Sequence, residues 1–244
     1  MDIVVIVLGI AAAVSLFTWI ASIITRDYSW VDRIWSIVPI VYVAAFWAAS
    51  GFTDARLTIM TVLVALWGAR LTFNFARKGG YNGVEDYRWP ILRERMSPGQ
   101  FQVFNLLFIV IFQNGLLLLI SLPALLAFQN QATPVGPLDL LLAGAFLALL
   151  IGEFIADQQQ WDFQRTKAAT IAAGDQPEQR FVASGLWRFS RHPNFFFEQA
   201  QWWVFFGLGA AALVSVLHWT LVGPVLLTAL FIGSTIFTES ITRS

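Results

Sequence analysis

The chain has no cysteine among its 244 residues. This absence excludes disulfide bonds, thiolate metal sites, cysteine-ligated iron–sulfur clusters and cysteine nucleophiles. Charge is also scarce: charged residues make up 12% of the chain and the formal net charge is zero, so no nucleic-acid partner is expected. Hydrophobic residues reach 57%, which exceeds the usual content of soluble globular domains. The composition therefore predicts an integral membrane protein.

Metal and nucleotide motifs are missing as well. The two histidines, His192 and His218, fall on opposite sides of the predicted membrane arrangement described below. The sequence contains no His-x-x-x-His spacing, no dense carboxylate cluster, no GxGxxG and no Walker loop. We therefore expect no metal site. We also expect that any bound nucleotide is held by a fold other than the Rossmann and P-loop folds to which these motifs belong.

Long apolar runs predict seven transmembrane helices, because a helix needs about 20 mostly apolar residues to cross a bilayer. The second run is short, and Pro39 is expected to kink it. No internal repeat or low-complexity linker divides the chain, so residues 1–244 are predicted to form a single all-α domain. The predicted spans are residues 3–24, 34–50, 55–76, 101–128, 138–156, 195–217 and 219–239.

The distribution of lysine and arginine predicts the orientation. All of them except Arg56 fall on one side of the seven-span arrangement, including Arg243 after the last span. Positive charge marks the cytosolic side of a membrane protein. The N-terminus is therefore predicted outside and the C-terminus in the cytosol, together with two long loops, residues 77–100 and 157–192.

Polar residues recur at helical spacing near the predicted cytosolic ends of five spans. Side chains three or four residues apart project from one helix face. Snorkelling at the membrane interface explains any single residue, but it favours Lys and Arg over buried acids and amides. We therefore expect these stripes to face one another around a hydrated cavity that opens to the cytosol. The stripes are Asp32 and Ser36; Arg70, Asn74 and Arg77; Gln102 and Asn105; Glu153, Asp157, Gln160 and Gln164; and Asn194, Glu198 and Gln201.

The first cytosolic loop reads ARKGGYNGVEDYRWPILRERM. Its glycines permit close backbone approach, and its arginines suit bidentate phosphate recognition. Tyr81, Tyr87 and Trp89 are able to stack on a planar base. The composition of this loop suits the binding of a nucleotide with several phosphates. It equally suits the binding of anionic lipid by a basic loop beside the membrane.

The second cytosolic loop ends at His192-Pro193. Proline is favoured at the first position of a helix, so the sixth span is predicted to start there. The N-terminus of a helix attracts anions. Asn194 and Glu198 follow on one face, within the first two turns.

Two stretches, GLWRFSRHPNFFFEQAQWW and ADQQQWDFQRTK, resemble the C-terminal domain of steroid 5-alpha-reductase-like membrane proteins. YSWVDRIWSIVPI and WGARLTFNFARKGGYNGVEDYRW extend the similarity over nearly the whole chain, and it is greatest to the bacterial branch labelled DUF1295. A closely similar Arg-His-Pro-Asn-x-x-x-Glu motif occurs in isoprenylcysteine and phospholipid methyltransferases, which bind S-adenosylmethionine.

The resemblance implies a seven-helix reductase in a bacterial inner membrane. It implies NADPH bound from the cytosol and hydride transfer to the β-carbon of an enone in a flat lipid. Asn194 and Glu198 match the residues that bind the nicotinamide amide in that family. Together, the stripes, the loops and the resemblance predict the following cofactor-binding residues: Arg70, Asn74, Arg77, Tyr87, Arg88, Asp157, Gln160, Arg165, Lys167, Arg191, His192, Asn194 and Glu198.

The chain departs from the steroid enzymes where they polarise the substrate carbonyl. Their third span carries a tyrosine, whereas this third span has none and places Trp67 three residues before Arg70. Asp32 is expected to replace their glutamate on the second span. The predicted catalytic residues are therefore Asp32, Trp67 and Tyr87, with Tyr28 and Tyr42 as alternative donors.

Two other functions compete with enone reduction. Methyl transfer from S-adenosylmethionine uses a similar motif, but that cofactor has no phosphate for the two arginine-rich loops to bind. A transporter or a non-catalytic lipid-binding protein would need polar residues through the full membrane depth, and the outer half lacks them. The expected partners are a lipophilic substrate that enters from the bilayer and membrane lipids. The oligomeric state is left open, with a monomer as the working expectation.

Overall fold

A computed structural model of the protein describes residues 2–83 and 85–243, apart from the side chains of residues 242 and 243. The side chain of Arg243, counted in the orientation prediction, therefore lies outside the described part. Every regular element in the described ranges is a helix, which confirms the all-α prediction. The elements are α1 (Ile3–Thr25), α2 (Trp30–Ile34), α3 (Val38–Ala49), α4 (Ala55–Arg77), α5 (Arg88–Glu94), α6 (Pro98–Phe104), the π-helix η1 (Asn105–Phe112), α7 (Gln113–Ser121), α8 (Pro123–Gln129), α9 (Pro137–Ala172), the 3-10 helix η2 (Gly185–Arg188), α10 (Pro193–Leu213), the 3-10 helix η3 (Trp219–Leu221) and α11 (Val222–Arg243).

Five helical segments of the described chain are long and apolar enough to cross a membrane. They are α1, α4, the continuous body Pro98–Gln129, α9 and the segment Trp219–Ile241. Helix α3 is apolar but has only 12 residues, and the 21-residue helix α10 carries polar side chains in its first turns. The chain is therefore a membrane protein by composition and helix length, while the count of seven spans and the orientation stay predictions.

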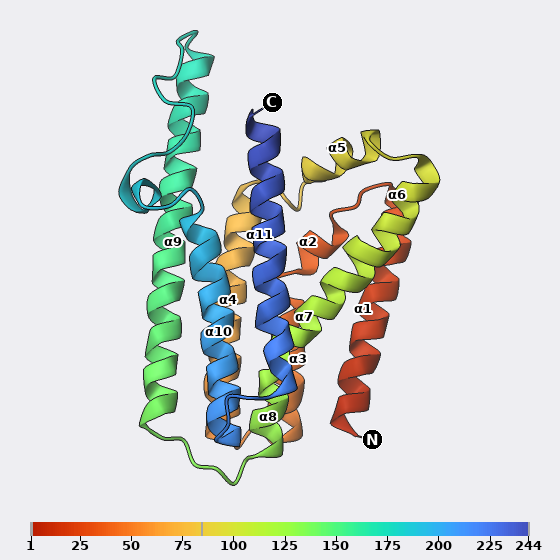
Figure 1. The fold of residues 1–244 in the computed structure, drawn as a ribbon, viewed down its shortest axis with the longest axis vertical. Helices are drawn as coiled ribbons and strands as arrows, with labels where there is room; N and C mark the ends of the chain where they lie inside the picture. The colour runs from red at the N-terminus through yellow and green to blue at the C-terminus, as the bar shows by residue number, and fades with distance from the viewer. Residues whose placement is uncertain (1, 84, 244) are drawn as a thin grey trace.

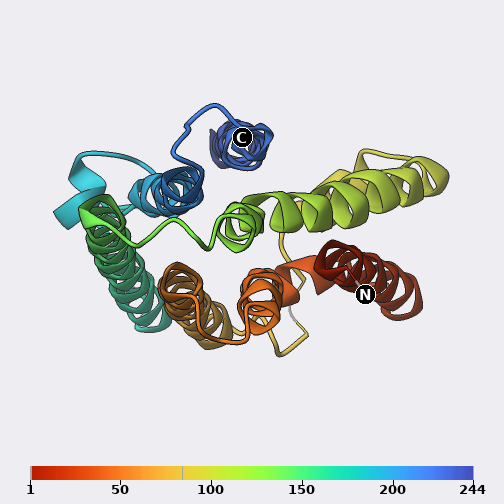
Figure 2. The same cartoon turned by 90° about the horizontal axis from the view of Figure 1, so that it is seen from below.

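The long helices run side by side, and the two ends of the bundle differ (Figure 1). The N-terminus lies at one end. The C-terminus, the loop between α4 and α6, and the extension of α9 lie at the other. Seen from below, α9, α4, α3 and α1 follow one another around one side and face α10, α11 and the α6–α8 body (Figure 2). Both predicted cytosolic loops thus share one end of the bundle.

Local sequence explains where several helices start. The Asp54 side chain caps α4 by accepting a hydrogen bond from the Leu57 N–H at 2.7 Å. Helix α10 begins at Pro193, as predicted. The predicted kink at Pro39 is wrong: Pro39 lies in the first turn of α3, where its missing N–H leaves no hydrogen bond unmade. Helix α9 continues beyond the predicted span and ends at Ala172, so the first part of the predicted loop 157–192 is helical.

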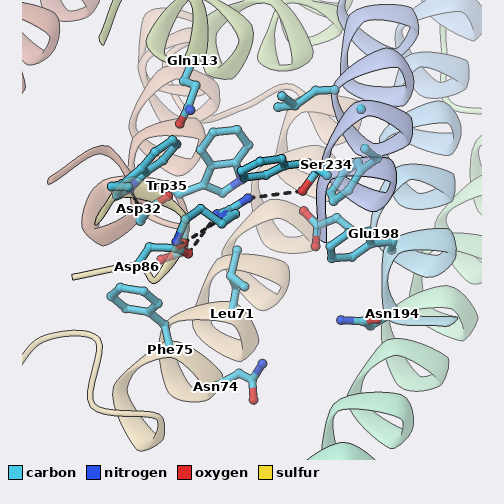
Figure 3. A pocket seen from close by; sticks show the side chains of 18 of the residues that line it. Asp32, Trp35, Leu71, Asn74, Phe75, Asp86, Gln113, Asn194, Glu198 and Ser234 are labelled. Atoms are coloured by element: carbon cyan, nitrogen blue, oxygen red, sulfur yellow. Dashed lines mark hydrogen bonds and ion pairs between the residues drawn. The ribbon is translucent and has the colours of Figure 1, made fainter. Parts of the chain in front are cut away.

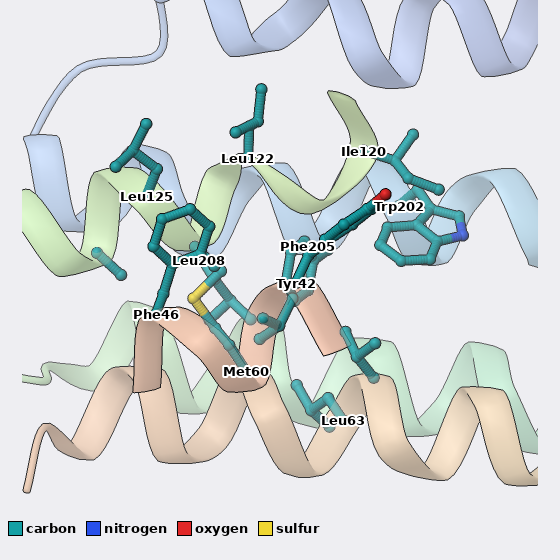
Figure 4. Packing of buried hydrophobic residues seen from close by; sticks show 14 of the residues in the cluster. Tyr42, Phe46, Met60, Leu63, Ile120, Leu122, Leu125, Trp202, Phe205 and Leu208 are labelled. Atoms are coloured by element: carbon teal, nitrogen blue, oxygen red, sulfur yellow. The ribbon is translucent and has the colours of Figure 1, made fainter. Parts of the chain in front are cut away.

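The apolar core lies where α3, α4, α8 and α10 meet (Figure 4). Tyr42, Met60 and Phe205 are fully buried there. Gly209 allows α10 to approach α8 closely, because a Cβ at this position would lie 2.6 Å from the carbonyl oxygen of Pro123. The contact between these two backbones needs glycine and anchors α10 against the rest of the bundle.

A buried ion pair joins α4 to α9 at the end opposite the long loops. Arg56, the single basic residue predicted on the outer side, is 2% exposed. Its Nε donates to Asp139 Oδ1 at 2.7 Å and its Nη2 donates to Asp139 Oδ2 at 3.0 Å. Its remaining donors bind the carbonyl oxygens of Thr133 and Pro134. Arg56 is therefore a structural residue that ties the starts of two helices together.

We expect Arg56→Met to lower the free energy of unfolding by about 3–5 kcal/mol, because it leaves the Asp139 carboxylate buried and unpaired. Thermal or denaturant unfolding of the detergent-purified protein measures this loss. The matched control is Arg95→Met, since Arg95 is exposed. Equal stability of the two variants would contradict a structural role for the Arg56–Asp139 pair.

The absence of cysteine allows a direct test of orientation. The variants Ala132→Cys and Gln176→Cys each place one thiol at an exposed position, in the loop before α9 and in the loop before η2. We expect a membrane-impermeant maleimide to label the Ala132→Cys variant in intact cells and the Gln176→Cys variant only after permeabilisation. The reverse pattern would show the opposite orientation. Labelling of both variants in intact cells would place both loops on the same side of the membrane and would contradict the predicted arrangement of spans.

Candidate functional site

A cavity of about 730 Å³ lies between α4, α9, α10 and α11, and residues of α2, α5, α6, η1 and α7 close its other side. It is lined by the last turns of α4 and the first turns of α10, so it lies toward the end that carries the long loops. Figure 3 shows Asn194 and Glu198 on one side of this space and Asp32, Trp35 and Asp86 on the other, with Asn74 between them at the bottom of the view.

One wall of the cavity is aromatic. Phe104, Phe108 and Phe112 line it from α6 and η1. Successive rings are stacked, with centroids 5.0 Å and 5.4 Å apart and interplanar angles of 19° and 11°. The π-helix aligns these rings along one face, and π-helical turns are frequent at functional sites. The result is a row of aromatic rings along one side of the cavity.

The opposite wall is an ion network centred on Arg70. Its Nη2 lies 2.9 Å from Glu153 Oε1 and 3.1 Å from Glu198 Oε2, and its Nη1 lies 2.6 Å from Asp157 Oδ2. None of these four residues is more than 8% exposed. Because buried charges require partners, the network fixes α4, α9 and α10 relative to one another.

Neutral donors complete the network behind Arg70. The indole N–H groups of Trp67 and Trp202 both point to Glu198 Oε1, at 3.0 Å and 3.4 Å. The Gln201 side-chain amide donates to Glu153 Oε2 at 2.6 Å. These contacts orient both carboxyl groups, and they place Trp67 behind the cavity wall and not in the lining.

A second polar cluster lies across the cavity. The Trp89 indole N–H donates to Asp32 Oδ2 at 3.3 Å. Arg88 binds both carboxylate oxygens of Asp86, at 2.8 Å and 2.9 Å, and reaches Ser234 Oγ of α11 at 3.2 Å. Burial raises the pKa of Asp32 to about 6, although the Arg88 guanidinium opposes this change. Asp32 is therefore about half protonated near pH 6 and mostly ionised at pH 7.

Several polar atoms at the cavity have no partner within the described structure. Asn194 Oδ1 and Arg70 Nε are buried and accept or donate no hydrogen bond there. Lys78 lines the cavity at the end of α4, and no hydrogen bond or ion pair joins it to a described residue. Burial lowers the pKa of Lys78, while Asp157 opposes that change. Such groups are available to a ligand, because buried polar groups are normally paired.

The structure brings together about half of the predicted site residues. In four of the five polar stripes, side chains face the cavity. In the fifth, Gln102 binds Tyr28 and Asn105 binds Ser22 instead. The predicted residues that line the cavity are Asp32, Arg70, Asn74, Arg88, Asp157, Asn194 and Glu198.

Other predicted residues lie nearby but outside the lining. Arg77 binds Asn74 and Gln158 and stacks over the Trp161 ring. Tyr87 is 52% exposed, and its hydroxyl lies 3.5 Å from Thr238 Oγ1 of α11. The predicted roles of Arg77 and Tyr87 stay predictions.

The remaining predicted residues lie at the outer edge of the site. The extension of α9 beyond Asp157 carries Gln160, Arg165 and Lys167. Lys167 donates a hydrogen bond to the Arg180 carbonyl oxygen at 3.0 Å. Arg191 and His192 line a separate hollow of about 400 Å³ between α10 and α11. None of these five side chains reaches the main cavity.

Some lining residues were not among the predicted catalytic or cofactor-binding residues. Glu153 belongs to the stripe that was predicted to face the cavity, but it was given no role there. Lys78 was visible only as one of many basic loop residues. The aromatic lining gave no signal, because aromatic residues occur throughout the chain. The alternative donors Tyr28 and Tyr42 do not line the cavity. Within the described residues, no group of His, Asp and Glu has the geometry of a metal site.

The family model described as "Protein of unknown function (DUF1295)" matches residues 18–243, which include the whole cavity. The chain belongs to the DUF1295 family. The "Uncharacterized protein C594.04c" of Schizosaccharomyces pombe is 39% identical to this DUF1295 protein over 242 residues, covering 91% of this chain and 69% of the relative. No solved structure matches the chain significantly. Because that relative belongs to a yeast, the bacterial inner membrane stays a prediction for this DUF1295 protein.

Asp32 predicts a pH dependence of stability. Its folded-state pKa of about 6 lies above the ordinary value of 3.8. The stabilisation from the bound proton is therefore complete below pH 3.8 and is lost as the pH rises through 6. We expect Asp32→Asn to be more stable than the native protein near pH 7, by up to about 3 kcal/mol, and the difference to vanish below about pH 4. Unfolding curves at several pH values measure the difference in stability between the variant and the native protein. Asp175→Asn, at an exposed position, is the control. A stability difference for Asp32→Asn that does not change with pH would contradict the prediction.

Proposed function

We propose that this DUF1295 protein is a membrane reductase that uses NADPH to reduce an enone double bond of a lipophilic substrate. The observation that carries the proposal is the pair Asn194 and Glu198, one turn apart on α10 and both lining a large cavity with an aromatic wall. The reaction class comes from the resemblance of the Arg-His-Pro-Asn-x-x-x-Glu motif to steroid 5-alpha-reductase-like proteins.

Asn194 and Glu198 suit the carboxamide of a nicotinamide ring. A carboxamide has two N–H donors and one acceptor oxygen, and the buried Asn194 Oδ1 lacks a donor in the described structure. Glu198 adds carboxylate oxygens one turn deeper, held in place by Trp67 and Arg70. NADPH would supply the hydride, and these residues would orient the ring.

Lys78 suits the phosphate end of the cofactor. It is the cation at the cavity that no described side chain pairs, whereas Arg70 and Arg88 are already bound to carboxylates. A phosphate beside Lys78 would lie at the end of α4, next to the long loops. The basic residues of these loops lie beyond that point, where they would meet a long, multiply charged cofactor.

The substrate side of the cavity suits a flat lipid. The stacked rings of Phe104, Phe108 and Phe112 offer an extended apolar wall. Asp32 lies across from Glu198, and its partly protonated carboxyl group is able to donate to a carbonyl oxygen. Such a donor would stabilise the negative oxygen that forms when an enone accepts hydride.

One observation favours a second candidate, methyl transfer from S-adenosylmethionine. Five acidic residues line the cavity, Asp32, Asp86, Glu153, Asp157 and Glu198, against the three basic residues Arg70, Lys78 and Arg88. An excess of carboxylates suits the cationic sulfonium of that cofactor. The unpaired Lys78 at the cavity edge favours a phosphate-bearing cofactor instead.

Ligand binding by the purified protein tests the proposal. We expect NADPH to raise the melting temperature, and Asn194→Ala and Glu198→Gln each to weaken NADPH binding about 10-fold or more, because each removes a buried hydrogen bond to the ring. Asn130→Ala is the matched control, since Asn130 lies at the opposite end of the bundle. Stabilisation by S-adenosylmethionine alone would overturn the proposal in favour of methyl transfer.

A further inference from the structure

The smaller hollow of about 400 Å³ between α10 and α11 opens onto the outer surface of the bundle. Three of its apolar lining residues, Phe196, Ile232 and Ile236, are each more than half exposed. They fall within the predicted spans 195–217 and 219–239, where an outward-facing side chain contacts lipid. The hollow is therefore accessible to a molecule of the bilayer.

The polar residues of this hollow lie at its rim. Arg191 and His192 directly precede α10, and Glu239 lies near the end of α11. The first two precede one predicted span and Glu239 is the last residue of the next, which places all three at the depth of the lipid headgroups. A polar rim above an apolar lining matches the build of a phospholipid.

The rim carries one positive and one negative charge. The Arg191 guanidinium lies 3.7 Å from the Glu239 carboxylate, the Arg191 side chain is 72% exposed, and no hydrogen bond joins it to a described residue. Such an exposed pair contributes little to stability and is readily replaced by a ligand. Burial lowers the pKa of His192, while Glu239 opposes this change, so the imidazole is mostly neutral at pH 7. The rim thus suits a headgroup with one charge of each sign better than an anionic headgroup.

A buried acceptor discriminates between the common zwitterionic headgroups. The side chain of Gln199 lines the hollow, and its Oε1 is buried without a hydrogen-bond donor in the described structure. Buried polar atoms are normally paired. The ammonium group of ethanolamine has three N–H donors, as a lysine ammonium does, whereas the trimethylammonium group of choline has none. An ethanolamine headgroup would therefore supply the donor that Gln199 lacks.

We propose that the hollow between α10 and α11 binds one molecule of phosphatidylethanolamine. Its phosphate lies against Arg191, its ammonium group donates to Glu239 and Gln199, and an acyl chain follows the apolar lining into the bilayer. This lipid is a bound component of the protein and lies outside the main cavity. The inference does not depend on the reductase proposal, and it gives Arg191 a lipid phosphate in place of the predicted cofactor phosphate.

The bound lipid would support the wall of the main cavity. Phe195 of α10 and Phe231 of α11 line both the hollow and the cavity, and their ring centroids are 4.7 Å apart. A lipid in the hollow packs against the outer side of these two rings. It therefore holds α10 and α11 together beside the cavity, and we expect it to raise the melting temperature of the protein.

Competition between lipids tests the inference on the native protein. The detergent-purified protein, without nucleotide, is mixed with equal amounts of phosphatidylethanolamine, phosphatidylcholine and phosphatidylglycerol that carry the same acyl chains. Native mass spectrometry measures which lipid stays bound. We expect phosphatidylethanolamine to exceed each of the others by about tenfold, because only its headgroup pairs both charges and the buried acceptor. Equal retention of the three lipids, or a preference for either of the others, would overturn the inference.

Two variants test the contacts through lipid selectivity, which a general loss of structure does not redirect. Glu239→Gln gives the rim a net positive charge, so we expect the preference to move towards anionic phosphatidylglycerol. Gln199→Met removes the acceptor and keeps the side-chain length, so we expect the preference for phosphatidylethanolamine over phosphatidylcholine to fall severalfold. Glu178→Gln, at an exposed loop position, is the control that keeps the native selectivity. Unchanged selectivity in Glu239→Gln or in Gln199→Met would overturn the inference.

A third variant separates this inference from the reductase proposal. We expect Arg191→Gln to lower the retention of all three phospholipids severalfold, because they share the phosphate that Arg191 binds. Arg95→Gln, at an exposed position, is the matched control. Native retention of lipid by Arg191→Gln would overturn the lipid site, whatever the protein does with NADPH. Failure of the native protein to bind NADPH would overturn the reductase proposal alone.

Discussion

The ion network around Arg70 is the interaction on which the site depends. It joins α4, α9 and α10 at the cavity, and all of its members are buried. Removing one partner from such a network leaves the others charged and unpaired, so the three helices are held in one relative position. The Arg56–Asp139 pair fixes α4 against α9 again at the opposite end. Two buried arginines on α4 thus set its position along α9.

The cavity owes its shape to helices that differ in how tightly they pack. Glycines bring backbones together at several helix contacts, as Gly209 does against Pro123, Gly223 against Leu119, and Gly68 against Ser36 at the edge of the cavity. Near the long loops, α11 is joined to its neighbours by side chains, through Arg88 to Ser234 and through the rings of Phe195 and Phe231. Side chains, not backbones, therefore connect α11 to α5 and α10 at the cavity.

Division of the cavity into two walls suits a reaction between a polar cofactor and an apolar substrate. The wall formed by α4, α9 and α10 carries the charged groups, and the wall formed by α6 and η1 carries stacked rings. Asp32 and Arg88 lie between them and link α2, α5 and α11. A lipid held against the rings would therefore meet a cofactor held by the polar wall.

The sequence by itself determined the helical class, the approximate bounds of the long helices, and the residue types at the site. Apolar run length and proline position depend on local chemistry, so the start of α10 at Pro193 was predictable, and the spacing of Glu153, Asp157, Asn194 and Glu198 already placed them on common faces. The predicted kink at Pro39 was wrong because a proline kinks a helix only from its interior, and the sequence did not show that α3 begins at Val38. Only the tertiary structure decided that Arg70 meets three carboxylates, that Trp67 supports Glu198 from behind, and that Arg191 and His192 line another hollow. Those outcomes depend on how helices distant in sequence rotate and pack against one another, and helical periodicity carries no information about that packing.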